Sequence, residues 1–361
     1  MRIKLPVSRV AGMPLILGCF VVQALAGAPA VAADPVKVNA FNFPRAESDM
    51  YFARFVKLTG GLGKFFFFRT PTQIDQQDVI RMNRDTLYGG AVFDLDAGPV
   101  TITLPDTGKR FLSMQIVNQD HNTPETVYAP VKYTFTKEKV GTRYVATLFR
   151  VFMNPNDPAD VKAANALQDA IKAEQANAGK LELPDWDQET LKKTRDALLT
   201  LESLGGVKKN RFGMPNEVDT VSWLLSTASG WGGNPQKDAV YIPFFPGKSD
   251  GKTPYTLTLK DVPVDAFWSI TVYDEKGYMF ENEQKAYSVN SVTAKPEKDG
   301  SFVIQFGGDP KSAANFLATK PGWNTLMRLY RPRKELLDGT WKAPEPWFDK
   351  TWKPGDFELV K

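Results

Sequence analysis

The chain has 361 residues, a formal net charge of +4, one cysteine and one histidine. Its first 33 residues contain three basic residues and no acidic ones, so removing them lowers the net charge from +4 to +1. A near-neutral chain has no basic surface field to collect phosphates, which excludes nucleic acid as an expected partner. One histidine, His121, and no cysteine after Cys19 exclude the common zinc, blue-copper and facial-triad iron sites, so we expect no metal and no other cofactor.

The N-terminal 33 residues have the three-part layout of a secretory signal peptide. Three basic residues precede an apolar stretch over 10–26, and a run of small residues ends at Ala33. The apolar stretch is short for a membrane helix, and a lipid anchor at Cys19 would leave a still shorter apolar region before it. We therefore expect cleavage near Ala33, a periplasmic or secreted protein, and no stable membrane anchor once the leader is removed.

Residues 34–155 are predicted to form a first β module with an N-terminal helix. The helix is expected over 44–58, because Pro44 suits its first turn and two glycines follow at 60 and 61. Four consecutive phenylalanines at 65–68 are typical of a buried strand, with the wall of a hydrophobic ligand site as the alternative. Further strands are expected at 91–95, 100–104, 111–117 and 144–152. This spacing, with turns between the strands, is typical of a sandwich or jelly roll.

Residues 156–230 are predicted to form a helical connecting block. Its first helix begins after Asp157 and is expected to continue towards Gly179. Two more helices are expected over 188–204 and 216–228.

Residues 231–361 are predicted to form a second β module. Its strands are expected at 255–259, 267–273, 301–306 and 325–330. The expected fold class is mainly β with helical insertions (α+β), in which the helical block joins two β-sandwich or jelly-roll-like modules.

Several stretches of the chain match a known pattern, in order. They are RMNRDTLY at 81–88, WGGNP at 231–235, FWSITVYD at 267–274 and RLYRP at 328–332. With these stretches the chain resembles the bacterial family that joins two domains of unknown function, twelve-fifty-four and twelve-fourteen. The resemblance implies a two-module, mostly β architecture and no settled activity. One departure is that relatives carry histidines near the phenylalanine run, where this chain has only phenylalanine, so any role of those histidines is in doubt here.

The first candidate site is the segment 83–88, which combines amide, guanidinium, carboxylate and phenol groups. Asn83, Arg84 and Tyr88 are candidate ligand-binding residues. The guanidinium of Arg84 could bind a carboxylate or sulfate through two parallel hydrogen bonds. Asp85 is a candidate acid or base. The alternative is a buried polar network that ties neighbouring loops together.

The second candidate site is the end of the strand predicted at 111–117. Gln115 and Asn118 are candidate ligand-binding residues, and Asp120 beside His121 is a candidate acid–base pair, because histidine titrates near neutrality. Adjacent residues of an extended strand point to opposite faces, so the pair shares a site only if the chain turns there. The alternative is a structural histidine whose ring nitrogens have hydrogen-bond partners within the protein.

Three aromatic residues complete the candidate ligand-binding set: Trp231, Trp268 and Tyr273. They would form a platform for a sugar or a flat apolar ligand, and the alternative is that they are core residues. The glycines after Trp231 permit a close backbone approach.

These residues leave three functions open. The first is binding of a small molecule, such as a carbohydrate or an aromatic acid, in a cleft between the modules. The second is a carboxylate-dependent hydrolase or lyase that uses Asp85 or Asp120 with His121, and the third is a structural envelope protein. A homo-oligomer also remains open. We expect the loop 83–88 and the strand end 115–121 to form one polar surface, which requires the intervening strands to cross between layers.

Overall fold

The computed structural model describes residues 34–77, 80–205 and 210–343. The predicted signal peptide, its cleavage point after Ala33 and Cys19 lie outside these residues. The chain divides into two units, Met1–Pro35 and Val36–Lys361, and every helix and strand named below belongs to the second. Across the described ranges the fold is mainly β with six α-helices, which confirms the predicted class. No described helix combines the length and the apolar character that crossing a membrane requires.

The first β module is built from two sheets. The first sheet has the order β1 (Phe66–Phe67), β2 (Thr86–Asp94), β7 (Tyr144–Phe152), β4 (Leu112–Asn118) and β5 (Glu125–Tyr128), and the second has the order β6 (Val131–Phe135), β3 (Val100–Leu104) and β8 (Lys172–Glu174). The chain leaves the first sheet after β2, passes through β3 in the second sheet and returns as β4. β2 and β4 run parallel on either side of β7, and Leu87 and Leu112 both pair with Val151 at the end where they start. The chain crosses between layers as predicted. However, Asn118 at the end of β4 pairs with Val145, whose other neighbour is Phe93 near the end of β2, so the segment 118–121 lies about a strand length from the loop 83–88.

Apolar side chains from both sheets form the core of this module. Leu87, Ala91 and Phe93 of β2 meet Ile102 and Leu104 of β3 in one buried cluster. These three β2 residues alternate along the strand, so they occupy one face of the first sheet. The opposite face of that sheet carries Tyr88, Gln115 and Arg150 and is free to meet other parts of the chain.

The second β module also consists of two sheets over one apolar core. One has the order β12 (Ser288–Asn290), β11 (Trp268–Tyr273), β15 (Asn324–Tyr330) and β9 (Ala239–Phe244), and the other has the order β10 (Tyr255–Leu259), β13 (Phe302–Phe306) and β14 (Asn315–Leu317). Trp268, Ile270 and Met327 point into the core between them. The other face of the first of these sheets carries Ser269, Thr271, Tyr273 and Arg328, all of them buried.

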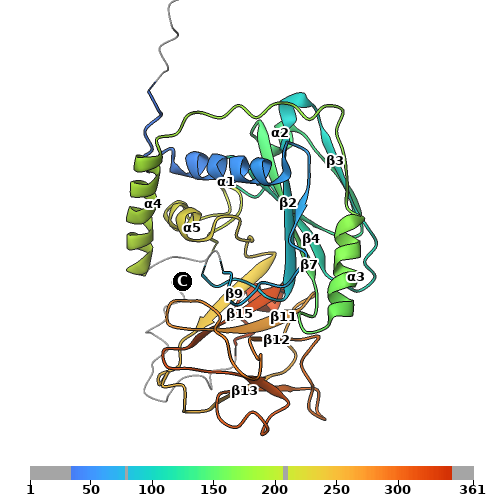
Figure 1. Cartoon of the computed structure of the whole chain (residues 1–361), viewed down its shortest axis with the longest axis vertical. Helices are drawn as coiled ribbons and strands as arrows, with labels where there is room; N and C mark the ends of the chain where they lie inside the picture. Colours follow the sequence, from blue (N-terminus) through green and yellow to red (C-terminus); the bar gives the residue numbers. More distant parts are fainter. Residues whose placement is uncertain (1–33, 78–79, 206–209, 344–361) are drawn as a thin grey trace, which may run out of the picture. The chain divides into compact units, whose positions relative to one another are not determined.

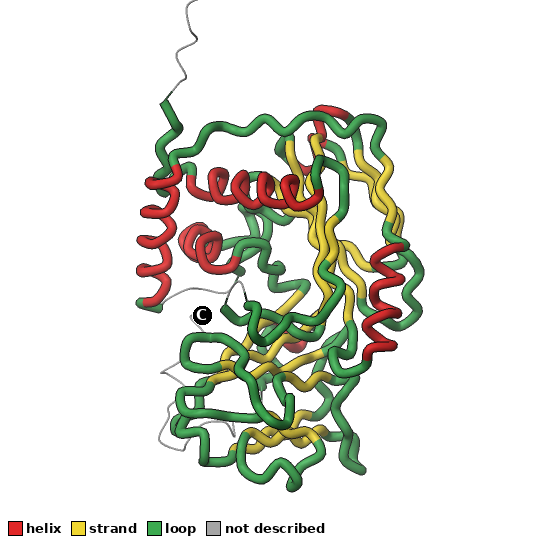
Figure 2. The backbone as a smooth tube through the Cα atoms, in the orientation of Figure 1, coloured by secondary structure: helices red, strands yellow, loops and turns green. Residues whose placement is uncertain are grey.

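Six helices accompany the sheets, and Figure 1 shows α1, α4 and α5 on one side of β2 and α3 on the other. Their bounds are α1 Phe43–Thr59, α2 Lys137–Val140, α3 Pro158–Asp169, α4 Gln188–Ser203, α5 Thr220–Gly230 and α6 Lys334–Leu337, with a short 3₁₀ turn at Leu95–Ala97. Asp157, Asp187 and Asp219 cap the first turns of α3, α4 and α5 with their carboxylates. In Figure 2 the helices flank the strands from both sides.

Two expectations about local structure are wrong. Only Phe66–Phe67 form a strand within the phenylalanine run, and this strand is half-buried because it lies at the edge of its sheet. The helix after Asp157 ends at Asp169, well before Gly179, because the chain turns to place β8 beside β3.

The two modules meet along one surface, which we call the junction. It lies between the non-core face of β2, β7, β4 and β5 and the polar face of β11, β15 and β9. A small aromatic cluster that includes Phe152, Phe267 and Tyr330 joins the two sides, with Phe152 of the first module 4.6 Å from Phe267 of the second between ring centroids.

Candidate functional site

A row of polar side chains crosses the first sheet at the junction. Tyr88, Arg150, Ser113 and Tyr128 are directly paired on β2, β7, β4 and β5, so they share one face. Arg150 is 6% exposed and lies over the Tyr88 ring, 5.6 Å from its centroid. Its two Nη atoms donate to Gln115 Oε1 and to the Gly232 carbonyl, each at 2.8 Å. Tyr88, Gln115 and the loop after Trp231 therefore meet around one guanidinium.

Gly232 makes this arrangement possible. A Cβ atom at this position would lie 2.8 Å from Leu148 Cδ1, and its φ of +77° is unfavourable for other residues. The glycine thus lets the loop pass close enough to β7 for its carbonyl to reach Arg150.

A second guanidinium, Arg328 of β15, lies on the facing sheet. It donates to the hydroxyls of Thr271 (3.1 Å) and Tyr273 (2.8 Å) and to the Arg81 carbonyl (2.6 Å). Tyr273 in turn donates to the Met82 carbonyl at 2.8 Å. Tyr273 is thus a buried link between the modules, and its hydroxyl helps to hold the segment before β2.

Asp85 and Asn83 bind the second module as well. Asp85 accepts hydrogen bonds from Asn290 Nδ2 at 2.8 Å and from the Ser288 hydroxyl at 3.3 Å, and its burial raises its pKa. Asn83 Nδ2 donates to the Tyr330 hydroxyl at 2.9 Å. These bonds are those of a buried polar network between loops, the alternative that the sequence left open for this segment.

Arg84 points to a different part of the second module from Asp85. Its guanidinium lies 5.2 Å from the Tyr287 ring centroid and donates to the Thr72 carbonyl. The two neighbouring residues therefore do not act on one site.

His121 is a buried, neutral side chain. The Gly232 N–H donates to its Nε2 at 2.9 Å, so Nδ1 carries the proton and donates to the Thr227 hydroxyl at 2.8 Å. Burial lowers its pKa to about 3. The ring also stacks on Trp231 at 5.7 Å.

Asp120 does not share these surroundings. Its carboxylate forms an ion pair with Arg45 at 2.6 Å and is 43% exposed, and the chain turns at His121, whose φ is +57°. Asn118 closes that turn by accepting from the backbone N–H groups of Asp120 and Asn122. The predicted acid–base candidates Asp85, Asp120 and His121 thus have no partner in common.

The two remaining aromatic candidates lie apart from each other. Trp268 is 3% exposed and belongs to the core of the second module. Trp231 stacks on Tyr51 with 4.4 Å between ring centroids, and its Nε1 donates to the Ser48 hydroxyl at 3.0 Å. Both faces of its indole are thus in contact with His121 and Tyr51.

The arginines reveal a functional pattern that the sequence analysis missed. Seven arginines in the described residues have a carboxylate within 4.0 Å: Arg45, Arg69, Arg110, Arg143, Arg195, Arg211 and Arg333. Six in the same residues have none: Arg54, Arg81, Arg84, Arg150, Arg328 and Arg331. Five of these six, all but Arg54, lie at the junction. Asp85 and Asp238 are buried there too, but neither lies within 4.0 Å of an arginine of the described residues.

A pocket opens at one edge of the junction and is lined by both modules. Its volume is about 150 Å³. Its walls include Phe111 and Tyr128 from the first module and Phe267 and Arg331 from the second, with Lys109 at the rim. The Arg331 guanidinium lies 4.7 Å from the Tyr128 ring centroid. The pocket therefore combines aromatic surface with three cationic side chains, Lys109, Arg110 and Arg331, and one carboxylate, Asp265. Arg110 is paired with Asp160, and Asp265 is paired with Arg333.

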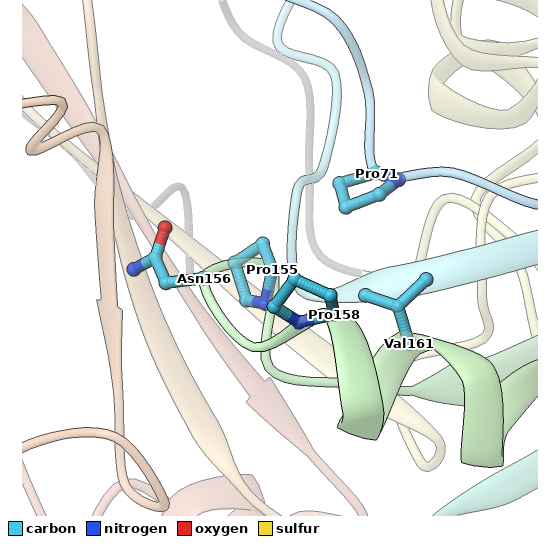
Figure 3. A pocket seen from close by; sticks show the side chains of 5 residues that line it. All are labelled: Pro71, Pro155, Asn156, Pro158 and Val161. Carbon is cyan, nitrogen blue, oxygen red and sulfur yellow. The ribbon is translucent and has the colours of Figure 1, made fainter.

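A second pocket, shown in Figure 3, lies away from the junction. It is lined by Pro71, Pro155, Asn156, Pro158 and Val161. Asn156 is the one polar residue among them, so no set of charged or polar groups converges there. Among the described residues, no group of three or more His, Cys, Asp or Glu side chains is placed to hold a metal ion.

Two family descriptions match the chain one after the other. Residues 62–175 match "Protein of unknown function (DUF1254)", and residues 247–334 match "Protein of unknown function (DUF1214)". The chain belongs to the family that carries these two domains in tandem. The predicted resemblance is confirmed.

Comparison with solved structures identifies proteins of similar fold. The VPA0106 protein from Vibrio parahaemolyticus has a TM-score of 0.65 and 19% sequence identity, and the alignment covers 85% of this chain and 96% of that one. A putative uncharacterized protein from Burkholderia cenocepacia has a TM-score of 0.48 and 14% identity, over 82% of this chain and 84% of that one. A search of curated proteins found no match. The Vibrio protein thus shares the fold of this family member.

The matched ranges divide the junction between the two domains. Tyr88 and Arg150 lie in the DUF1254 domain, whereas Arg328 and Arg331 lie in the DUF1214 domain. Gly232 comes from the segment between them. The unpaired arginines are therefore brought together by the tandem arrangement.

Proposed function

We propose that this protein is exported and that it binds a small anionic molecule at the junction of its two domains. The observation that carries this proposal is the group of five junction arginines without a carboxylate partner. Four of the five, all but the exposed Arg331, are buried or half-buried, and such cations are normally neutralised, since removing a charge from water costs several kcal/mol. An anionic ligand would supply the missing charge.

The junction pocket favours an aromatic acid over a carbohydrate. Phe111 and Phe267 lie 5.5 Å apart between ring centroids and form an apolar wall, and Arg331 supplies a guanidinium that has no carboxylate partner among the described residues. The pocket volume of about 150 Å³ equals that of a cavity that holds benzene, so a molecule with one ring fits by size. The hydrolase or lyase alternative has no comparable support, because Asp85, Asp120 and His121 face separate partners.

A calorimetric titration with benzoate and benzamide tests the ligand class. The two molecules have nearly the same shape, but only benzoate is charged. We expect benzoate to bind and benzamide and glucose not to bind at equal ionic strength. In Arg331→Gln, we expect the affinity for benzoate to fall about tenfold or more, because the charge-assisted hydrogen bonds are lost.

The matched control for this titration is Lys132→Gln. Lys132 is an exposed cation on β6, outside the junction, and its pair with Glu174 is 3.2 Å long. It should bind benzoate as the natural chain does. Equal binding of benzoate and benzamide, or an unchanged affinity in Arg331→Gln, would contradict the proposal.

Export is tested separately by intact mass spectrometry of the protein from the producing cell. We expect a chain that begins at Asp34. A retained Met1, or a lipid attached to Cys19, would contradict the proposed leader cleavage.

A further inference from the structure

We infer a second anion-binding site at the opposite end of the junction row, formed by Arg150 and Tyr88. Its ligand is an oxyanion, that is, a carboxylate or phosphate group. The inference does not depend on the aromatic-acid pocket around Arg331.

The first argument is the charge of Arg150. Its side chain is 6% exposed, and its printed partners, Gln115 Oε1 and the Gly232 carbonyl, are both neutral. Outside the junction, a largely covered arginine is paired with a carboxylate. Arg195, for example, is fixed by Glu47 through several short contacts, and that carboxylate is 1% exposed. Arg150 keeps further N–H groups that a carboxylate or phosphate oxygen could accept from.

The second argument is access from solvent. On the junction face of the three central strands β2, β7 and β4, only Tyr88 and Leu148 are partly exposed, and the other side chains there are buried. Tyr88 lies on β2 and Leu148 on the adjacent strand β7. Tyr88 pairs with Arg150, and Leu148 pairs with Gly90, two residues further along β2, so the two side chains are diagonal neighbours on one face. Partial exposure in the middle of a sheet means that this point is covered only in part, although Arg328 and Tyr330 of the second module interact with Tyr88 and the loop at Gly232 lies close to Leu148. The opening lies directly beside Arg150.

The third argument is a hydrogen-bond donor that has no assigned acceptor. The Tyr88 hydroxyl has no hydrogen-bond partner among the described residues, although its ring is held by Arg150. Burial raises the pKa of the nearby Tyr330, so that phenol also stays neutral beside the two arginines. An incoming oxyanion would meet one guanidinium and one phenol donor and no competing carboxylate.

The two anion sites are separate. Tyr88 and Tyr128 lie at the two ends of a four-strand row, roughly 14 Å apart at the usual spacing between strands. Arg150 and Ser113 lie between them and are buried. A one-ring ligand in the Arg331 pocket therefore does not reach the Tyr88 opening.

The test is a thermal unfolding series with sodium phosphate and with sodium acetate, each balanced with sodium chloride to constant ionic strength. An anion that binds only the folded state raises the Tm as its concentration increases, and the balance removes general screening. We expect at least one of the two salts to raise the Tm. A response to acetate alone would indicate a carboxylate site, and a response to phosphate alone would indicate a phosphate site, and either supports the inference.

Three variants identify the site. Tyr88→Phe keeps the fold because the removed hydroxyl has no described partner, and it should weaken the apparent anion affinity about tenfold. Leu148→Phe fills the opening without removing a hydrogen bond and should abolish the response. Arg150→Gln should also abolish it, provided that circular dichroism shows a folded protein.

Lys132→Gln is the matched control, since it removes one exposed cation outside the junction and should respond to the anion as the natural chain does. Arg331→Gln removes the pocket arginine and should retain a response even if benzoate binding is lost. No Tm response to either salt in the natural chain, or an undiminished response in folded Leu148→Phe and Tyr88→Phe, would overturn the inference. Loss of the response in Arg331→Gln alone would assign the anion to the pocket and would overturn it as well.

Discussion

The helices α1 and α4, which we call the helical layer, differ from the junction in whether buried charges are paired. In the helical layer, Arg195 meets Glu47, a carboxylate that is 1% exposed. At the junction, Arg150 and Arg328 are 6% and 3% exposed and have only neutral hydrogen-bond partners among the described residues. Buried charge is therefore paired in the helical layer and unpaired at the junction, where we propose that ligands bind.

Removing a carboxylate from the helical layer should have the largest effect on stability. In Glu47→Ala, Arg195 loses its partner while it is still largely covered, and we expect a loss of about 3 kcal/mol. Urea unfolding measures it. Glu189→Ala is the control, because the Glu189–Lys193 pair is exposed and its removal should cost less than about 0.5 kcal/mol. Equal effects of the two changes would remove the basis of the comparison.

Asp85→Ala tests the one fully buried carboxylate near the junction arginines. It leaves Asn290 Nδ2 without its acceptor and increases the charge imbalance around Arg328, so we expect a loss of about 2 kcal/mol in the free energy of unfolding. Asp309→Ala, at an exposed turn, is a control for the loss of one carboxylate. Surface substitutions usually change the free energy of unfolding by less than about 0.5 kcal/mol. A loss below that value for Asp85→Ala would therefore contradict its role in holding the modules together.

His121 should make the protein less stable as the pH falls. Its pKa is about 3 in the folded chain and about 6.5 when unfolded, so between these values the unfolded state binds the extra proton. The stability that depends on neutral His121 is complete above about pH 6.5 and declines below it, by about 3 kcal/mol at pH 4.5.

The measurement is urea unfolding of the natural chain and of His121→Gln at several pH values. Glutamine does not titrate, and its amide oxygen can still accept from the Gly232 N–H. The difference between the two chains should therefore shrink as the pH falls from 6.5 to 4.5. Parallel pH profiles would show that His121 is not held neutral.

Arg331→Gln should have the smallest effect on stability. Arg331 is exposed and has no carboxylate partner in the described residues, so we expect a change within about 0.5 kcal/mol. Thermal and urea unfolding without ligand measure this change. A loss above 1 kcal/mol would mean that Arg331 has a structural role, and a loss of benzoate binding in this variant would then be ambiguous.

The sequence predicted those elements whose own pattern of apolar and capping residues matches the burial that the fold gives them. The strand expected at 144–152 is β7, and the helix expected at 188–204 is α4, which an aspartate caps and an apolar stripe holds in place. It missed β5, which has only four residues and is partly exposed, so no clear alternation marks it. The phenylalanine run was misread because hydrophobicity alone does not distinguish an edge strand from a central one.

The site was only partly accessible from the sequence. Tyr88, Gln115 and the loop after Trp231 do meet, but the residue that joins them, Arg150, was not among the candidates. Its signal was a single charge inside the apolar strand TLFRVF. Whether such a charge is paired depends on contacts with residues far along the chain, such as Gly232. Conversely, Asp120 and His121 are adjacent in sequence, yet the turn at His121 sends them into different surroundings.

The position of β15 has a consequence for the order in which the protein folds. This strand comes last in the chain among the described strands, yet it lies in the interior of its sheet, between β11 and β9. Until residues 324–330 have been synthesised, β11 and β9 have no common neighbour, and Arg328 is absent from the junction. Long-range strand pairing of this kind is slow to form, because a long loop has to close first. A chain that lacks β15 thus has an open second module, and the two domains acquire their shared surface only once residues 324–330 are in place.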